Sequence, residues 1–322
     1  MEAGIAGAAP SDGFAISIVI ETANTRPDEY DDIHRTIAAL STQSISRSDY
    51  ELIVVVNPDV HPELSRQIAD RDPSVRIVDA PGTHFFGQKN VGARAASAPI
   101  VGFVDSDCTP TAEWARSVLD AFACHGDDMA AVQGPLTMDR GWLATAFRIR
   151  NFSHQQGAEE RRIPSLAVCN CGLRREELVS DPFGEIRYFH GAEVRKVAQL
   201  ALAGRYVLLV PGAACHHRFE PATLSYFLSR GAYWGYCFVE LRRDAPRSVP
   251  YTRFIRAAGP LAPLALAPAK GLLDIRRLVR FREYLGLGVA GLVGTSAALC
   301  LSAIATGYGA YRCLLGLSPP RF

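Results

Sequence analysis

Predicted strands and helices alternate four times within about the first 125 residues of this 322-residue chain. The strand-like runs are short and rich in Ile and Val, which is typical of strands buried on both faces. Such alternation predicts βαβ units and a mostly parallel α/β sheet covered by helices on both sides. The predicted strands are residues 16–20, 52–56, 75–78 and 100–104, and the predicted helices are residues 30–42, 62–71, 88–96 and 113–124.

The fourth apolar run leads directly into two carboxylates, Asp105 and Asp107. In an open α/β sheet, ligands bind outside the carboxyl ends of the strands. Two carboxylates this close repel each other and lose hydration unless a cation lies between them. The pair therefore indicates either a divalent metal site for a phosphate-bearing ligand or a polar turn in which an Asp caps the next helix.

The composition excludes several classes of protein. Hydrophobic residues make up 48% of the chain and charged residues 21%, which excludes a disordered chain. The net charge of +1 argues against a nucleic-acid partner. No G-x-G-x-x-G follows the first strand and no P-loop sequence occurs, so a dinucleotide-binding or P-loop domain is not expected. Residues 1–14 do not resemble a secretory signal, and we expect a short disordered tail there.

The eight cysteines show neither C-x-x-C spacing nor the Cys/His spacing of a zinc site. Cys169 and Cys171 would be a poor zinc pair at their separation of two residues. We therefore expect all eight to be small buried apolar residues in a reducing compartment.

The second half of the chain continues the α/β pattern, and then its character changes. A long helix rich in aromatic residues is predicted over residues 223–243. The other predicted elements are strands at residues 129–134, 166–173 and 206–210 and helices at residues 142–156, 174–179 and 193–203.

The last part of the chain is strongly apolar. Residues 285–317 carry no charge before Arg312, and this stretch is longer than the roughly 20 residues that cross a bilayer. Its glycines and small residues are typical of packed membrane helices. We therefore expect residues 246–322 to form a membrane-associated helical region; the alternative is a Gly/Ala-rich helix buried against a soluble domain.

The flanks of this apolar stretch indicate its orientation. Four arginines precede it, which places this side on the cytoplasmic face under the positive-inside rule and attracts anionic lipids. Prolines in the earlier segment favour an interfacial or re-entrant piece over a straight span, and the choice between one span and a hairpin stays open. The arginines are Arg276, Arg277, Arg280 and Arg282, and the prolines are Pro260, Pro263 and Pro268.

Seven short motifs follow one another in an order that resembles the family 2 glycosyltransferases. This resemblance covers about residues 15–245, implies the GT-A fold, and fits the membrane-associated bacterial type that works in cell-envelope polysaccharide biosynthesis. The motifs are Thr22-x-Asn24, Asn57-Pro58-Asp59, Gln88-Lys89-Asn90-Val91-Gly92-Ala93, Asp105-Ser106-Asp107, Asn170-Cys171-Gly172-Leu173-Arg174-Arg175-Glu176, Gly191-Ala192-Glu193 and Val210-Pro211-x-Ala213-x-x-x-His217.

The resemblance implies a donor-metal site. In such enzymes the Asp-x-Asp motif holds a divalent cation, Mn²⁺ or Mg²⁺, on the diphosphate of a nucleotide-sugar. It assigns Asp105 and Asp107 to the metal, with Asp105 also counted among the donor-binding residues. His217 matches a family histidine that completes the metal or phosphate site, although a lone histidine can equally be a polar core residue. The adjacent His216 is an alternative.

The resemblance also implies contacts to the donor. The nucleotide would lie over Thr22, Asn24 and Asn57. Lys89 and Asn90 would contact the donor phosphate or ribose.

The catalytic base implied by the resemblance is Glu193. It occupies the acidic position of a motif in which Ala192 replaces the usual Glu, so its position differs by about one methylene from that of the family's Asp. The alternative is an acid that only stabilises a helix N-terminus. Glu21 replaces a usual Pro, and Val56 with Asn57 replaces two usual Asp residues, which weakens any assignment of uridine.

We therefore expect a metal-dependent, inverting transfer of a single sugar to a hydroxyl of a membrane-associated or glycan acceptor, such as a lipid-linked saccharide. The Gln-x-x-Arg-Trp motif of processive synthases is absent, although Arg230 and Trp234 occur nearby. The expected location is the inner membrane, with the catalytic domain on the cytoplasmic side.

Two other functions compete with this expectation. The altered residues Glu21, Val56 and Ala192 also fit a catalytically degenerate module that binds a nucleotide-sugar or a partner. A nucleotidyltransferase would need a basic glycine-rich loop after the first strand, where residues 21–27 offer only Arg26.

Overall fold

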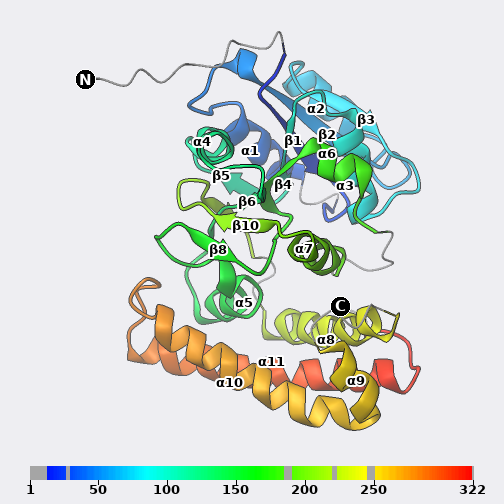
Figure 1. The fold of residues 1–322 in the computed structure, drawn as a ribbon, viewed down its shortest axis with the longest axis vertical. Coiled ribbons are helices and arrows are strands. Elements are labelled where there is room, and N and C mark those ends of the chain that lie inside the picture. Colours follow the sequence, from blue (N-terminus) through cyan, green and yellow to red (C-terminus); the bar gives the residue numbers. More distant parts are fainter. Residues whose placement is uncertain (1–12, 27–29, 185–190, 220–222, 245–250, 321–322) are drawn as a thin grey trace.

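The structure is a computed structural model that describes residues 13–320 except 27–29, 185–190, 220–222 and 245–250. The predicted disordered tail, residues 1–14, therefore lies outside the described residues except at its last two positions. An α/β domain occupies one end of the molecule and a layer of helices the other (Figure 1).

An eight-stranded sheet forms the centre of the α/β domain, in the order β3-β2-β1-β4-β9-β6-β10-β8. Strands β9 and β8 are antiparallel to their neighbours, and the remaining six share one direction, which confirms the mostly parallel sheet. The strands are β1 (Ile16–Glu21), β2 (Tyr50–Val56), β3 (Arg76–Asp79), β4 (Ile100–Asp105), β6 (Met129–Gln133), β8 (Arg161–Ile163), β9 (Asn170–Arg174) and β10 (Tyr206–Leu209).

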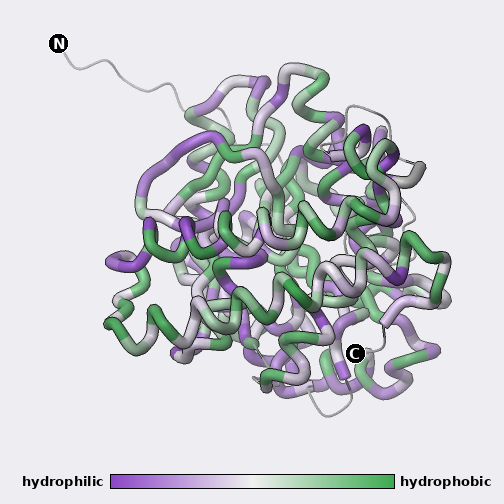
Figure 2. Tube along the Cα trace, turned by 90° about the horizontal axis from the view of Figure 1, so that it is seen from below, coloured by the Kyte–Doolittle hydropathy of each residue, from purple (hydrophilic) through white to green (hydrophobic). Residues whose placement is uncertain are grey.

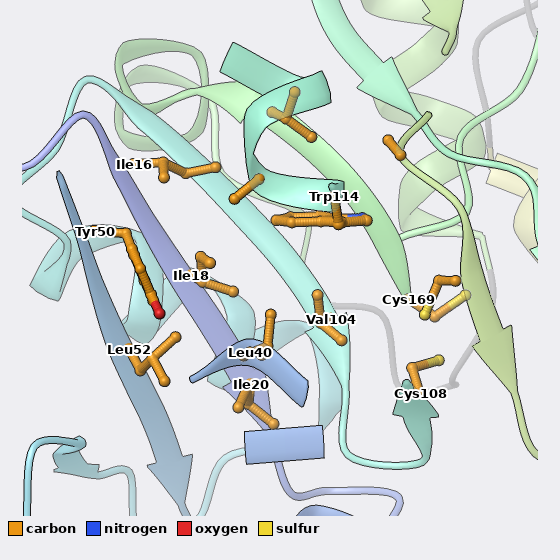
Figure 3. Packing of buried hydrophobic residues seen from close by; sticks show 14 of the residues in the cluster. Ile16, Ile18, Ile20, Leu40, Tyr50, Leu52, Val104, Cys108, Trp114 and Cys169 are labelled. Atoms are coloured by element: carbon orange, nitrogen blue, oxygen red, sulfur yellow. The ribbon is translucent and has the colours of Figure 1, made fainter. Parts of the chain in front are cut away.

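Alternate residues of the buried strands face two separate cores. Ile16, Ile18 and Ile20 of β1 pack with the helices on one face, and Figure 3 shows Ile20 near Leu40 and all three on the side of the sheet that Trp114 covers. Val19 points to the opposite face. The first face is covered by α1 (Tyr30–Leu40), α2 (Leu64–Arg71) and α4 (Trp114–Cys124), and the second by α3 (Phe85–Ala95), α6 (Arg175–Ser180) and α7 (Ala192–Leu202).

A small second sheet lies beside the carboxyl end of β4. Its order is β5-β11-β7, with β5 (Cys108–Pro110) antiparallel to β11 (Cys215–His217) and β7 (Leu136–Thr137) parallel to it. Because Cys108 and His217 are paired residues in this sheet, it carries His217 to the segment that follows Asp107.

Some element boundaries differ from those predicted. Helix α3 begins at Phe85, before residue 88, because Phe85 and Phe86 are buried against the sheet. The predicted strand at residues 166–173 is confined to β9, because Asn170 N–H donates to the Ala167 carbonyl in a turn just before it. The predicted helix at residues 142–156 divides into α5 (Trp142–Phe152) and η3 (Ser153–Gln155), and η2 (Arg47–Asp49) precedes β2.

The prediction for the cysteines is only partly correct. All eight are free thiols, and six are buried. Cys124 and Cys300 are exposed, because each lies on the outer side of its helix.

Four helices and a turn form the layer below the α/β domain (Figure 1). They are α8 (Leu224–Asp244), α9 (Thr252–Ala258), η4 (Gly259–Leu261), α10 (Ala262–Phe281) and α11 (Val289–Leu314). Among the described helices, α11 alone is long and apolar enough to cross a bilayer, with a mean hydropathy of 1.8. Its outer face is left open, since Val289 is 81% exposed and Ile304 70%. Figure 2, which views the molecule from the side of this layer, shows long hydrophobic stretches there.

A buried ion-pair network connects this layer to α5. The Asp274 side chain of α10 has no exposed surface, and both its oxygens lie 2.5 Å from Lys270 Nζ. The guanidinium groups of Arg150 and Arg277 approach the same carboxylate at 3.7 Å. A buried carboxylate is tolerable only with such partners, so the network fixes α10 against α5.

Glycines let α8 and α11 come into backbone contact. A Cβ at Gly235 would overlap the backbone of Thr306, and one at Gly309 would overlap the backbone of Ala232. Small residues have this role where helices approach closely. Helix α8 therefore belongs physically with the C-terminal helices, although the predicted domain boundary at residue 245 separates them.

We predict that Gly309→Ala destabilises the protein by about 2 kcal/mol, because the added methyl group forces the two helices apart. Thermal unfolding in detergent would measure the loss. Gly288→Ala is the matched control, since Gly288 also belongs to the α11 segment, has a φ of −76° and has open space around its Cβ position. Equal melting temperatures for the two variants would contradict the proposed close packing.

Candidate active site

A cavity of about 680 Å³ lies between the carboxyl ends of the central strands and helix α8. Five of the predicted site residues line it, namely Asn24, Asp105, Asp107, Glu193 and His217. They come from the loop after β1, the end of β4, the start of α7 and the end of β11. The fold thus brings residues that are far apart in the sequence to one cavity.

A buried cluster of two acids and one lysine lies at the base of this cavity. Glu21 and Asp105 end the neighbouring parallel strands β1 and β4 at the same level. Lys89 of α3 places its Nζ 2.6 Å from Asp105 Oδ1, and its side chain has no exposed surface. The ammonium group also lies over the ring of Phe85. The Lys89 ammonium group therefore interacts electrostatically with two buried carboxyl groups, those of Asp105 and Glu21.

The charges of this cluster shift its protonation equilibria. Burial and the Asp105 carboxylate raise the pKa of Glu21 to about 8, although the Lys89 cation opposes them. Burial by itself would lower the pKa of Lys89, but Asp105 and Glu21 raise it above its usual value. At neutral pH the cluster therefore holds a neutral Glu21 beside an Asp105–Lys89 ion pair.

Hydroxyl groups hold the loop that carries Asp107. The Thr36 hydroxyl donates to the carbonyls of Ser106 and Cys108, at 2.9 and 2.7 Å. The Thr25 hydroxyl donates to Ser106 Oγ at 2.7 Å. The Asp107 carboxylate is left facing the cavity, with 35% of its side chain exposed.

His217 approaches the same carboxylate from β11. Its Nε2 lies 3.9 Å from Asp107 Oδ2, and its Nδ1 lies 2.7 Å from the Arg218 carbonyl. A carbonyl can only accept, so Nδ1 carries the proton and Nε2 presents its lone pair to the cavity. The neighbouring His216 turns away to Asp139, at 3.3 Å, and does not line the cavity.

These donors suit a hard divalent cation. Burial raises the pKa of Asp107, and the negative charge of Asp105 adds to this effect while His217 opposes it. A bound cation would remove the repulsion between the two carboxylates. Carboxylate oxygens and one imidazole are ligands that Mn²⁺ accepts, so Asp105, Asp107 and His217 fit the metal that the sequence predicted.

Glu193 lies at the N-terminus of α7 and lines the cavity. Its Oε2 accepts a hydrogen bond from Gly191 N–H at 2.9 Å, and Gly191 has a φ of 123°, a conformation that favours glycine. Burial raises the pKa of Glu193 to about 7. A carboxylate with this pKa is well suited to accept a proton near neutral pH.

The other predicted donor-binding residues do not line the cavity. The Thr22 hydroxyl donates to the Val55 carbonyl at 3.0 Å, and Asn57 donates to the Thr83 carbonyl at 3.3 Å. Asn90 exchanges two hydrogen bonds with the backbone of Phe183, and Lys89 is paired with Asp105. Contacts from these four side chains to a donor stay predictions, and in this structure each one holds protein groups together.

Several residues in the cavity or next to it were not assigned to the site from the sequence. Glu21 was noted only as a departure from the family pattern, although its position at the end of the neighbouring strand could have placed it beside Asp105. The aromatic helix at residues 223–243 was predicted, but the sequence did not show that the packing of distant helices brings arginines and aromatic rings of α5 and α8 to the cavity. They are Arg150, Arg230, Arg242, Phe147, Phe152, Tyr226, Trp234 and Phe238.

Comparisons with known proteins agree with this geometry. The sequence model of Glycosyl transferase family 2 matches residues 17–179, about half of the chain. The mostly parallel sheet flanked by helices is a GT-A fold. The chain belongs to glycosyl transferase family 2. Glu193 and His217 lie beyond the matched residues.

Among curated proteins, the chain is similar to the glycosyltransferase AglE of Haloferax volcanii, with 25% identity over 169 residues. The alignment covers 52% of this chain and 54% of that protein, so the chain spans about half the length of its relative.

Two solved structures share the fold. One is the mannosyltransferase PcManGT from Pyrobaculum calidifontis, with a TM-score of 0.55 and 17% identity over 91% of this chain and 86% of that one. The other is GalNAc-T7, with a TM-score of 0.51 and 13% identity over 77% of this chain and 54% of that one.

We predict that Glu21→Gln stabilises the protein increasingly as the pH rises. Because the folded pKa of Glu21, about 8, lies above its ordinary value of 4.5, the wild type loses stability as the pH rises between these values. The variant has no such proton to lose. Between pH 5 and pH 8.5, its advantage in unfolding free energy should grow by about 4 kcal/mol.

Denaturant unfolding with EDTA present would measure this difference at both pH values. Glu63→Gln, at an exposed position, is the control. A difference between Glu21→Gln and wild type that does not change with pH would show that Glu21 is ionised in the folded protein.

Proposed function

We propose that this protein transfers a single sugar, with inversion, from a nucleotide-diphospho-sugar to a hydroxyl group of a membrane-associated acceptor. The observation that carries the proposal is that Asp105, Asp107 and Glu193 line one cavity. The carboxylate pair provides a place for the donor diphosphate, and Glu193 provides a separate base. The solved structures with this fold hold GDP-mannose with Mn²⁺ and UDP with GalNAc and Mn²⁺, which makes guanosine and uridine donors the first to test.

The roles of the residues follow from their positions. Asp105, Asp107 and His217 would hold Mn²⁺ or Mg²⁺, which when bound neutralises the charge on the departing nucleoside diphosphate. Lys89 orients Asp105 through their 2.6 Å ion pair. Glu193 takes the proton of the acceptor hydroxyl as its oxygen attacks the anomeric carbon from the face opposite the diphosphate.

The acceptor side of the cavity favours an anionic, partly apolar molecule. Arg150, Arg230 and Arg242 line the cavity together with aromatic rings of α5 and α8. The Arg230 guanidinium lies 5.5 Å from the centroid of the Trp234 ring. Guanidinium groups bind phosphates well, and aromatic rings cover apolar chains. We infer a lipid-linked saccharide whose phosphate lies among these arginines and whose sugar hydroxyl reaches Glu193.

The helical layer fits such an acceptor. Helix α11, which has an open apolar face, lies in the same layer as α8, which lines the cavity (Figure 1). Arginines of α10 would face anionic headgroups. We propose that residues 246–322, with the neighbouring α8, seat the protein on the cytoplasmic side of the inner membrane, with residues 15–245 as the catalytic GT-A domain.

We predict that Glu193→Gln lowers kcat roughly 100-fold or more, because the amide cannot accept the proton. The wild-type rate should rise with pH up to about 7 and then level off, since burial raises the pKa of Glu193 to that value and only the ionised form acts as a base. Transfer of radiolabelled sugar from a panel of nucleotide-sugars would measure both effects.

Glu176→Gln is the matched control, because Glu176 also lies in the first turn of a helix but is exposed and outside the cavity. If Glu193→Gln turned over at the wild-type rate, Glu193 would not be the catalytic base. The degenerate binding module would be favoured if the wild type bound a nucleotide-sugar but transferred no sugar with any donor and acceptor of the panel.

We predict that Arg230→Gln raises the KM for a lipid-linked saccharide about tenfold and leaves the KM for the donor unchanged, because only the acceptor phosphate loses a charged partner. Polyprenyl-diphosphate-linked saccharides in detergent and soluble oligosaccharides would serve as the two acceptor probes. Arg71→Gln, at an exposed position of α2, is the control. Equal transfer to the soluble oligosaccharides would contradict a lipid-linked acceptor.

A further inference from the structure

A second set of metal-binding side chains lies next to the carboxylate pair. One ligand atom from each of Cys108, Cys169 and His217 lies within 4.8 Å of the other two. The three residues are too far apart in the sequence to form a metal-binding motif. The two cysteines were predicted to be small buried apolar residues. Figure 3 shows Cys108 and Cys169 beside each other at the edge of the core.

The strand pairing explains why these residues meet. Cys108 and His217 are opposite each other in the β5–β11 pair. Cys169 lies just before β9, and its carbonyl accepts a hydrogen bond from Asp105 N–H at 3.2 Å. Three separate segments therefore hold the three side chains, each through backbone hydrogen bonds.

The spacing is close to that of a tetrahedral zinc site. Bond lengths of about 2.3 Å to sulfur and about 2.0 Å to nitrogen place the ligand atoms roughly 3.5–3.8 Å apart. Side-chain movements of about 1 Å would convert the observed spacing into this one. A further donor is Asp107, whose Oδ1 lies 3.6 Å from Cys108 Sγ and whose Oδ2 lies 3.9 Å from His217 Nε2.

The histidine is already in the form that a metal requires. The Arg218 carbonyl accepts the Nδ1 proton at 2.7 Å, which leaves the lone pair on Nε2. Metal-bound histidines are commonly oriented by such a hydrogen bond from the other ring nitrogen. An ion can also reach the group, because Cys169, Asp107 and His217 line the open cavity.

We propose that Cys108, Cys169 and His217, with Asp107 as the fourth ligand, bind a thiophilic divalent cation such as Zn²⁺. Binding forms two metal–sulfur bonds and releases the two thiol protons to solvent. The two metal sites share Asp107 and His217, so they cannot be filled together. Zinc therefore displaces the hard cation and inhibits transfer; this consequence, unlike the binding itself, rests on the proposed function.

Cadmium titration of the full-length, reduced protein in detergent tests the site without any activity. Cd²⁺ bound by thiolates absorbs in the near ultraviolet through sulfur-to-metal charge transfer, which neither oxygen nor imidazole ligands produce. We expect a saturable band in the wild type and a loss of at least about tenfold in affinity in Cys169→Ala and in Cys108→Ala. Circular dichroism would show that each variant is folded.

Two control variants keep the site intact. Cys171→Ala removes another buried thiol two positions from Cys169, and Cys124→Ala removes an exposed one. Both should retain the saturable band. A wild-type band in folded Cys169→Ala and Cys108→Ala, or no band in the wild type, would overturn the proposal.

A second measurement separates this proposal from the proposed function. Each variant's transfer rate with Mn²⁺ is compared with and without Zn²⁺, relative to its own zinc-free rate. Inhibition in the wild type that is at least about tenfold weaker in Cys169→Ala supports the shared site. If the wild type showed the cadmium band but transferred no sugar, the proposed metal site would be supported and the proposed function contradicted.

Discussion

The buried ion pair between Lys89 and Asp105 is the interaction on which the cavity depends. It joins α3 to the end of β4, and through Glu21 it also involves the end of β1. Removing one partner of a buried pair typically costs about 3–5 kcal/mol, because the other charge stays in the dry interior. The lysine therefore compensates the Asp105 carboxylate at the buried end of its strand through a 2.6 Å ion pair. Lys89 therefore supports the carboxylate pair from below the cavity, since its own side chain has no exposed surface.

Much of the α/β fold could be predicted from the sequence, and the reason is local. Apolar runs such as residues 16–20 and 100–104 indicate buried strands by their composition. Apolar residues at helical spacing indicate the helices between them. The order of the motifs also pointed to the carboxylate side chains Asp105, Asp107 and Glu193, which line the cavity. The ion pair of Lys89 with Asp105 could not be predicted, because it depends on how α3 packs over β4, and the donor contact of Lys89 stays a prediction. The closeness of the Cys108 and Cys169 thiols could not be predicted for a similar reason. The pairing of distant strands brings them together, and no sequence spacing indicates it.

The C-terminal helices show where composition alone is insufficient. Hydropathy located the apolar stretch, and α11 is the described helix that could cross a bilayer. It did not show that one side of α11 is used for packing against α8, with Gly235 and Gly309 in backbone contact with the opposite helix. Nor did it show the buried Asp274 that fixes α10 to α5 through Arg150 and Lys270. These contacts depend on three-dimensional neighbours that a linear pattern does not specify.

Helix α8 has two different surfaces, and their combination has a mechanical consequence. One surface lines the cavity with Arg230 and Trp234, and the other packs without intervening side chains against α11. Helices in such contact move as one body, so a change in the tilt of α11 would displace the cavity wall as well. In the proposed membrane-bound arrangement, the thickness and lateral pressure of the surrounding lipids would thus act on the width of the proposed acceptor entrance.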